Sequence, residues 1–275
     1  MRNETCKAAL CQLRTETNRD LTMEKTARMV REAAQNGADI VVLPEMFNCP
    51  YSREYFKTFA ALGHEETVQI LSTLARENQV LLVGGSVPEA SEGKLYNSCF
   101  VFDEQGRQIA RHRKVHLFDV DIPGMHFHES HSFAPGAEIT TFDTRFGVMG
   151  AAVCFDVRFA ELFRAMALRG AQVVFLPAQF NYKTGPRHWE LLLRARAADN
   201  QVFMLGCSAA RYVGFPYECW GHSTVVDPYG QVLVSCDETE QILYAELDLS
   251  QVGAARSQIP TLSALREDVY PVAKG

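Results

Sequence analysis

The segment Asn36-Gly-Ala-Asp-Ile-Val-Val-Leu-Pro-Glu-Met-Phe47 is repeated in outline by Arg169-Gly-Ala-Gln-Val-Val-Phe-Leu-Pro-Ala-Gln-Phe180. In each copy a glycine ends a helical stretch, a short apolar run typical of a doubly buried strand follows, and a proline closes it. A second pair, Val101–Ile109 and Val225–Leu233, carries an Asp-x-x-Gly hairpin turn in both copies. The two offsets, 133 and 124 residues, are nearly equal. They favour internal duplication over a chance similarity of the glycines and prolines that end helices and strands in α/β proteins.

Two equivalent halves predict a specific architecture. Two sheets, each with alternating helices, bury their apolar faces by packing against each other with the helices outside. We therefore predict an α/β fold, a four-layer αββα sandwich with two pseudo-symmetric halves. The expected helices are 20–35, 65–78, 158–169 and 186–199, and residues 115–138 form a long irregular loop. The expected strands are 7–13, 40–43, 80–86, 95–102, 108–114, 139–144, 146–153, 173–176, 202–208, 223–226, 231–235 and 242–248.

The composition is that of a globular protein. A length of 275 residues allows one large domain or two small ones. A hydrophobic content of 47% and a charged content of 22% exclude a disordered, collagenous or coiled-coil chain. Because neither a linker nor a low-complexity segment interrupts the pattern, we predict a single domain over residues 1–275, which ends in a polar tail, 249–275.

Charge, apolar runs and cysteines indicate the surroundings of the protein. A net charge of −6 without blocks of like charge argues against nucleic acid or an anionic membrane as a partner. Apolar runs such as 148–153 are far too short to cross a bilayer, and the charged start MRNETCK is unlike a signal peptide. The eight cysteines include no CxxC pair. We therefore expect free thiols in a reducing cytoplasm.

The duplication is asymmetric at one position. Leu43-Pro44-Glu45 in the first half corresponds to Leu176-Pro177-Ala178 in the second. A carboxylate at the end of a buried strand is costly unless it has a partner or a function. Glu45 is therefore a candidate site residue, and an ion pair or a helix cap is the alternative interpretation.

Cys154 is the second candidate. It follows the apolar run 147–153 and precedes Phe155-Asp-Val-Arg158, where a helix is expected to begin. A strand-to-helix elbow of this kind exposes a nucleophile and turns the following backbone N–H groups toward whatever is bonded to it. An inert core cysteine is the alternative.

Lys114, at the end of the expected strand 108–114, is the third candidate. An ammonium beside a thiolate and a carboxylate favours the thiolate and can bind a developing oxyanion. The alternative is a basic sheet edge that prevents strand pairing.

These candidates lie in three segments that strongly resemble the signatures of the nitrilase superfamily of carbon–nitrogen hydrolases, and the resemblance extends from the first expected strand to Asp248. The segments are Leu43-Pro44-Glu45, His112-Arg-Lys-Val-His-Leu-Phe118 and Val153-Cys-Phe-Asp-Val-Arg-Phe159. The resemblance implies a fourth site residue, Glu129. It also implies at least a homodimer, for which the elements near Cys154 and the tail 249–275 are the expected interface.

Two further segments, 180–190 and 220–224, are most similar to the Nit2-like branch that contains the ω-amidases. Those enzymes hydrolyse the side-chain amides of 2-oxo acids. We therefore predict an amidase acting on a small linear amide that bears a carboxylate. An N-carbamoyl-amino-acid hydrolase or a nitrilase with the same triad is the alternative enzyme. A catalytically silent interaction protein of the same fold is the non-enzyme alternative, against which the intact triad argues.

The residue types suit this chemistry, because an amide is a poor electrophile that needs a nucleophile, a base and an oxyanion clamp. Glu45 would take the proton of Cys154 and later give it to departing ammonia. Lys114 and the backbone N–H of Phe155 would hold the oxyanion. Water activated by Glu45 would then hydrolyse the thioester. Glu129 would hold Lys114 and the substrate amide in place.

Substrate recognition is assigned to residues around the elbow. Arg158, expected in the first helical turn, can bind a carboxylate in a bidentate way, although pairing with Asp156 or Glu161 is the alternative. Phe180 and Thr184 follow the strand that mirrors the Glu45 strand, so they should line the mouth. Tyr51 could cover it.

The histidines of the long loop do not predict a metal site. His126, His128 and His131 surround Glu129 with the spacing H-x-H-E-x-H, not the helical H-E-x-x-H. A complete thiol mechanism needs no zinc. We predict neither a metal nor another cofactor.

Overall fold

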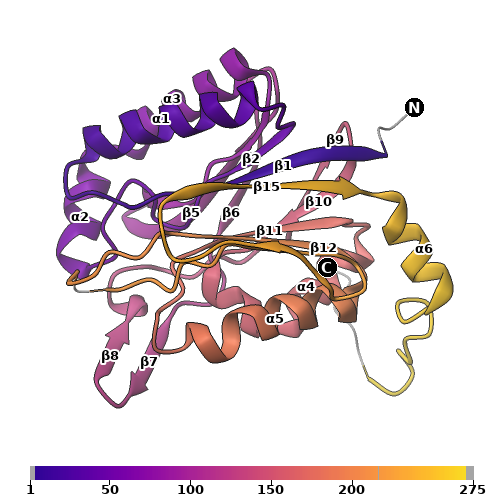
Figure 1. The fold of residues 1–275 in the computed structure, drawn as a ribbon. Coiled ribbons are helices and arrows are strands. Elements are labelled where there is room, and N and C mark those ends of the chain that lie inside the picture. The colour runs from indigo at the N-terminus through magenta and orange to yellow at the C-terminus, as the bar shows by residue number, and fades with distance from the viewer. Residues whose placement is uncertain (1–3, 216, 271–275) are drawn as a thin grey trace.

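The computed structural model describes residues 4–215 and 217–270, which form four layers (Figure 1). Two sheets face each other in the middle. Helices α1 (Arg19–Gln35) and α3 (His64–Asn78) cover the outer face of one sheet, and α4 (Ala160–Leu168) and α5 (Gly185–Asn200) cover the other. The predicted αββα sandwich is therefore confirmed.

The two sheets repeat one strand arrangement, three parallel strands between two antiparallel ones. In the first sheet, β1 (Thr5–Gln12), β2 (Ile40–Val42) and β3 (Leu81–Val83) lie between β15 (Gln241–Asp248) and β5 (Lys94–Phe102). In the second, β10 (Gly147–Ala151), β11 (Val173–Ala178) and β12 (Phe203–Ser208) lie between β9 (Thr140–Thr144) and β13 (Thr224–Val226). β6 (Gln108–Arg113) and β14 (Val232–Ser235) extend equivalent edges, and β4 (Val87–Ser91) also pairs with β5. The duplicated segments thus place β2 and β11 at equivalent central positions.

Successive side chains of β1 point alternately into two different cores, and this explains the continuous apolar run at its centre. Ala8 and Leu10 belong to the core that includes Phe175 of the facing sheet, whereas Ala9 and Cys11 belong to the core beneath α1 and α3. Successive strand residues point to opposite faces. A strand covered on both sides therefore needs apolar residues at every position.

The predicted strand 80–86 is wrong in its second half, since β3 already ends at Val83. The cause is Gly85, whose φ is +61° and where a Cβ atom would lie 2.2 Å from the Pro44 carbonyl oxygen. Only glycine allows the chain to pass so close behind that proline. The chain turns there, and β4 begins at Val87.

The helix expected from residue 158 begins instead at Ala160, after a 3₁₀ turn over Cys154–Arg158. The turn is tightened because the Asp156 N–H donates to the Val153 carbonyl (3.0 Å) while the Asp156 carboxylate accepts from the Val153 N–H (2.9 Å). Phe159 then adopts extended backbone angles. Arg158 thus closes a 3₁₀ turn and does not lie in a first α-helical turn.

The region expected to be an irregular loop contains a small hairpin, β7 (Asp119–Ile122) and β8 (Met125–His128), followed by a 3₁₀ turn over Glu129–His131. Its turn includes Gly124 with φ +76°, and a Pro-Gly pair at that position is a recognised turn signal. Helices α2 (Arg53–Ala61) and α6 (Ser250–Gln258) are two further elements that the sequence pattern does not predict.

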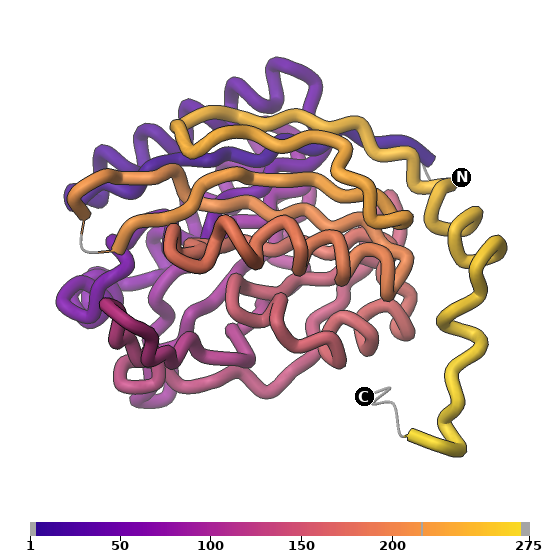
Figure 2. Tube along the Cα trace, turned by 60° about the horizontal axis from the view of Figure 1, so that its bottom comes forward, coloured from indigo at the N-terminus to yellow at the C-terminus, as the bar shows by residue number. Residues whose placement is uncertain are grey.

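Part of the predicted polar tail packs on the second half of the molecule. α6 buries Val252 and Ala255, and the Gln201 side chain donates to the carbonyls of Ala255 (2.8 Å) and Ile259 (2.6 Å). After Leu262, which still packs against the core, the chain runs away from the sandwich (Figure 2). Residues 271–275 of the predicted tail lie outside the described residues.

The core between the sheets should dominate stability. Phe175 is fully buried in β11, so Phe175→Ala should lower the free energy of unfolding by about 3–5 kcal/mol through lost burial and a residual cavity. Leu191→Ala on α5 is the control, since that side chain is 62% exposed and the change should stay within about 0.5 kcal/mol. Urea unfolding measures both, and equal losses would contradict this account of the core.

Candidate active site

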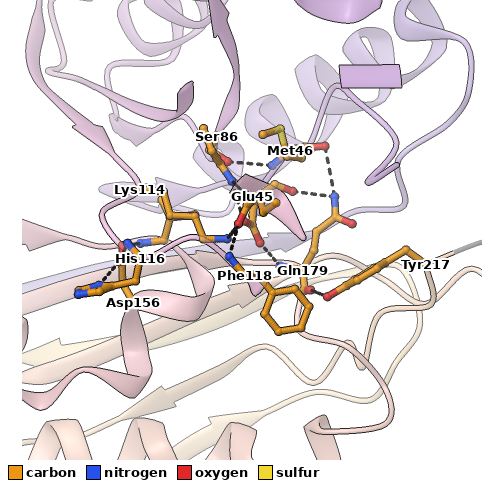
Figure 3. Close-up of polar contacts among 12 residues, drawn as sticks. Glu45, Met46, Ser86, Lys114, His116, Phe118, Asp156, Gln179 and Tyr217 are labelled. Carbon is orange, nitrogen blue, oxygen red and sulfur yellow. Dashed lines mark hydrogen bonds and ion pairs between the residues drawn. The ribbon is translucent and has the colours of Figure 1, made fainter. Parts of the chain in front are cut away.

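Four predicted residues come from separate places in the chain, and the structure brings them together. Glu45 follows β2, Lys114 follows β6 and Cys154 follows β10, so all three lie beyond the carboxyl ends of strands, the usual place for a site in α/β sheets. The Lys114 ammonium lies 2.8 Å from Glu45 Oε1 (Figure 3) and 2.8 Å from Oε2 of Glu129. Glu45, Lys114 and Glu129 are fully buried, and Cys154 is nearly so.

Two buried carboxylates therefore share one ammonium. Burial raises the pKa of Glu45, and the negative Glu129 raises it further, while Lys114 opposes both. Burial alone would lower the pKa of Lys114, but Glu129 and Glu45 outweigh it and hold that pKa above its ordinary value. The lysine is a permanent cation in this environment, and Glu45 is a base of increased strength.

Asn97 of β5 holds both carboxylates, and the sequence analysis missed it. Its Nδ2 donates to Glu45 Oε1 (2.8 Å) and to Oε1 of Glu129 (2.9 Å). Glu129 Oε2 also accepts the backbone N–H of Phe118 (2.7 Å). The available signal was an amide within an expected strand whose residues are mostly apolar, since polar side chains are buried only when they are hydrogen-bonded.

Gln179 is a second residue that the sequence analysis missed. Its backbone N–H donates to Glu45 Oε2 (2.8 Å), and its side chain donates to the Glu45 carbonyl (2.9 Å). Its own carbonyl accepts from the Tyr217 hydroxyl (3.0 Å; Figure 3). In the repeat, Gln179 corresponds to Met46, the residue after Glu45. Alignment of the two halves therefore carried the signal.

Met46, which follows the expected base, and Cys154, the expected nucleophile, both have a positive φ. Met46 (φ +46°) and Cys154 (φ +45°) lie in the left-handed region without being glycine. Each such residue costs about 1–3 kcal/mol and persists only where its surroundings enforce it. For Met46, the enforcing contact is its N–H bond to Ser86 Oγ (3.0 Å).

At rest the thiol of Cys154 is held as the neutral form. Burial raises its pKa well above the ordinary value, Glu45 adds to this through its charge and a hydrogen bond, and Lys114 opposes them. A proton is therefore available for transfer between sulfur and the Glu45 carboxylate.

A cavity of about 10 Å³ lies next to Cys154, which is roughly the space for one water molecule. Arg158, Phe180 and Thr184 line it. Tyr51, the expected cover of the mouth, packs on Tyr217 (ring centroids 4.6 Å apart) and lines the neighbouring cavity. Among the described residues, the lining consists of Phe118, Cys154, Phe155, Arg158, Phe180, Asn181, Thr184 and Tyr217.

Arg158 pairs with no carboxylate in the described part of the chain. Its guanidinium lies over the rings of Phe155 (5.5 Å) and Phe180 (5.2 Å) and 3.3 Å from His188 Nδ1. Burial lowers its pKa, the direction expected for a cation in an apolar wall. The alternative pairing with Asp156 is wrong, because that carboxylate is occupied by two histidines.

Comparisons with known proteins agree with this geometry. The carbon–nitrogen hydrolase family model matches residues 7–257. The omega-amidase NIT2 of Mus musculus is 47% identical over 269 residues, which cover 98% of each chain. Nit3 of Saccharomyces cerevisiae, a member of branch 10 of the nitrilase superfamily, has a TM-score of 0.87 at 39% identity and covers 94% of this chain and 96% of its own. The C. elegans NitFhit protein has a TM-score of 0.91 at 32% identity over 98% of this chain and 67% of its own.

The chain belongs to the carbon–nitrogen hydrolase family. The resemblance read from the sequence is confirmed, and the protein is a hydrolase of carbon–nitrogen bonds. Within residues 4–215 and 217–270, this hydrolase has no helix long and apolar enough to cross a bilayer.

The three histidines around Glu129 are bound to other side chains of the hydrolase. His126 Nδ1 and His128 Nε2 lie 2.9 and 3.2 Å from the same oxygen of Asp121, and His131 contacts Arg53. The described residues hold no group of three or more His, Cys, Asp or Glu side chains arranged for a metal ion.

The charges around Cys154 predict opposite effects of two substitutions on its thiol. Glu45→Gln removes a negative neighbour and should lower the pKa of Cys154, whereas Lys114→Met removes the positive one and should raise it. The midpoint of the pH profile for alkylation of Cys154 by iodoacetamide should move down in the first variant and up in the second. Peptide mass spectrometry separates Cys154 from the other cysteines. An unchanged midpoint in both variants would contradict the assigned geometry.

Proposed function

We propose that this hydrolase is a thiol-dependent amidase of the ω-amidase type. It hydrolyses the side-chain amide of a small carboxylate-bearing substrate, such as 2-oxoglutaramate, to give 2-oxoglutarate and ammonia. The observation that carries the proposal is the guanidinium of Arg158 in the lining of the cavity next to Cys154, without a carboxylate partner among the described residues. The omega-amidase name of the mouse relative supports it.

Acylation begins with Glu45, which takes the thiol proton of Cys154 as the sulfur attacks the amide carbon. The carbonyl π electrons move to oxygen and form a tetrahedral oxyanion. Glu45 then gives its proton to the amide nitrogen, the carbon–nitrogen bond breaks and ammonia leaves. The product of this half-reaction is a thioester on Cys154.

The oxyanion is stabilised by Lys114 and the backbone N–H of Phe155. An ammonium has three N–H groups, and Glu45 and Glu129 each accept one from Lys114. The third is available to the oxyanion. Donors fixed in a buried site need no reorganisation when the charge develops, which is why such clamps contribute strongly to rate.

Deacylation uses the same base. Glu45 removes a proton from water while the water oxygen attacks the thioester carbon, and the thiolate leaves and regains the proton. Glu129 serves throughout by holding Lys114 and orienting the substrate amide. Asn97 and the Phe118 N–H keep Glu129 itself in place.

The cavity next to Cys154 must enlarge before the substrate can bind. A cavity of about 10 Å³ holds no five-carbon amide, so side chains of the lining must move for the substrate to bind. The carboxylate then meets Arg158, and the carbon chain lies against Phe155 and Phe180. Charge-assisted bidentate bonds to a guanidinium give both affinity and orientation.

The test of the proposed function is ammonia release across four substrate classes: ω-amides of 2-oxo acids, uncharged amides, ureido acids and nitriles. The proposal expects the highest kcat/KM for 2-oxoglutaramate, and Cys154→Ala supplies the blank. A preference for ureido acids would identify an N-carbamoyl-amino-acid hydrolase, and a preference for nitriles would identify a nitrilase. Release from none of them would identify a silent interaction protein.

Arg158 should control selectivity rather than turnover in general. Arg158→Leu should lower kcat/KM for 2-oxoglutaramate roughly ten- to a hundred-fold and spare an uncharged amide of similar length, because a charge-assisted contact contributes about 1.5–3 kcal/mol. Arg158→Lys should recover little, since a point charge cannot reproduce the planar fork. Equal losses on both substrates would instead assign Arg158 to support of the elbow.

We also infer that the hydrolase is cytoplasmic and at least a homodimer. The tail leaves apolar side chains in solvent, with Ile259 at 59% and Val269 at 66% exposure, and these are available to a second copy. Light scattering at micromolar concentration should give twice the 30.8 kDa chain mass or more. A monomer would contradict this inference.

A further inference from the structure

The segment that carries Lys114 has a histidine two residues away on each side, and the mechanism above uses neither. His112 is fully buried, and His116 is partly exposed. Both bind Asp156, which lies two residues after Cys154. Figure 3 shows the contact of His116 with Asp156. The contacts therefore connect the segment of the expected oxyanion clamp with the elbow of the expected nucleophile.

Asp156 accepts two donors on each oxygen. Oδ1 receives the backbone N–H of His116 (2.9 Å) and its ring Nδ1 (2.8 Å). Oδ2 receives ring Nε2 of His112 (3.0 Å) and the backbone N–H of Val153 (2.9 Å). Each oxygen thus binds one ring and one backbone group, and the carboxylate bridges two segments that are about 40 residues apart in the chain.

Each ring is fixed on its other side as well. Nδ1 of His112 lies 2.9 Å from the hydroxyl of Thr140 in β9. The ring of His116 stacks on Phe159 with centroids 3.5 Å apart and an interplanar angle of 7°. Burial alone would raise the pKa of Asp156, but the bonds from His112 and His116 outweigh it and hold that pKa below its ordinary value. Asp156 is therefore a permanent anion that both rings face.

We propose that His112 and His116 are positioning residues for Lys114: by binding Asp156 they set the position of the Lys114 ammonium relative to the Cys154 thiol. Lys114 is midway between them in the chain, and its own backbone N–H is held by the Asn97 carbonyl (2.8 Å). Release of either ring frees the segment on one side of the lysine. Misplacement of a catalytic group by about 1 Å can cost roughly a hundred-fold in rate.

This inference rests on the proposed function, and three variants test it. His116→Phe keeps a ring to stack on Phe159 and removes the N–H donor. His116→Asn restores a donor, because the amide nitrogen of asparagine can occupy the place of Nδ1. The matched control is His64→Phe on the outer helix α3, where the histidine ring also stacks on a phenylalanine (5.9 Å, 15°).

The primary measurements are single-turnover ammonia release from 2-oxoglutaramate with enzyme in excess, and the affinity for 2-oxoglutarate. His116→Phe should slow acylation by about ten- to a hundred-fold and leave the affinity within about two-fold. His116→Asn should regain most of the rate, and His64→Phe should match the parent. Acylation within about two-fold of the parent in His116→Phe, or an equal loss of affinity, would overturn the proposal, since a purely structural role lowers only thermal stability or affects both properties together.

Alkylation of Cys154 by iodoacetamide separates this proposal from the proposed function, because it needs no amide turnover. A displaced Lys114 lowers the thiol pKa less, so alkylation at neutral pH should be slower in His116→Phe and restored in His116→Asn even if no amide is hydrolysed. Equal alkylation rates in the three His116 forms would overturn the positioning role. If His116→Phe does not fold, Thr140→Val releases the other ring with little change of shape, and unchanged alkylation and acylation there would overturn the proposal.

Discussion

The ammonium of Lys114 between two buried carboxylates is the interaction on which the rest of the site depends. Without the cation, burial and the charge of Glu129 would raise the pKa of Glu45 unopposed. Burial and the charge of Glu45 raise the pKa of the adjacent thiol, and Lys114 opposes this rise as well. Removing one partner of a buried ion pair costs about 3–5 kcal/mol. This cost explains why an amide and backbone N–H groups, in addition to the ion pairs, hold the carboxylates in place.

The duplicated fold supplies the positions for this charge cluster. The cluster forms only once, because the second half has Ala178 where the first half has Glu45. Equivalent strands of both sheets end at the same region, and Gln179, the counterpart of Met46, binds Glu45 across the pseudo-symmetry. A glutamate in place of Ala178, the counterpart of Glu45, would add a like charge next to a carboxylate whose pKa burial already raises. The second half instead contributes the elbow and the wall that contains Phe180 and Thr184.

The sequence predicts the layers well because doubly buried strands and capped helices leave local signals. It also proposes Glu45 and Cys154 individually as candidate site residues, the first by the broken repeat and the second by the elbow. Their juxtaposition depends on sheet order, which spacing along the chain does not encode. The 3₁₀ turn that relocates Arg158 depends on Asp156, whose carboxylate binds not only the nearby Val153 N–H but also two histidines that lie 40 or more residues away. Asn97 was missed for a similar reason: its role appears only when two distant carboxylates converge on it.

The pairing of β15 with β1 has a consequence for synthesis of the chain. All eight residues of Thr5–Gln12 pair with Gln241–Asp248, so the sheet that presents Glu45 keeps an unsatisfied edge strand until the ribosome has translated codon 248. Exposed strand edges are templates for aggregation, and contacts this distant in sequence form slowly. A transcript truncated before codon 241 would therefore yield a nascent protein that contains both Glu45 and Cys154 but whose first sheet lacks its closing strand. Such a chain would be a substrate for chaperones and proteases rather than a smaller enzyme.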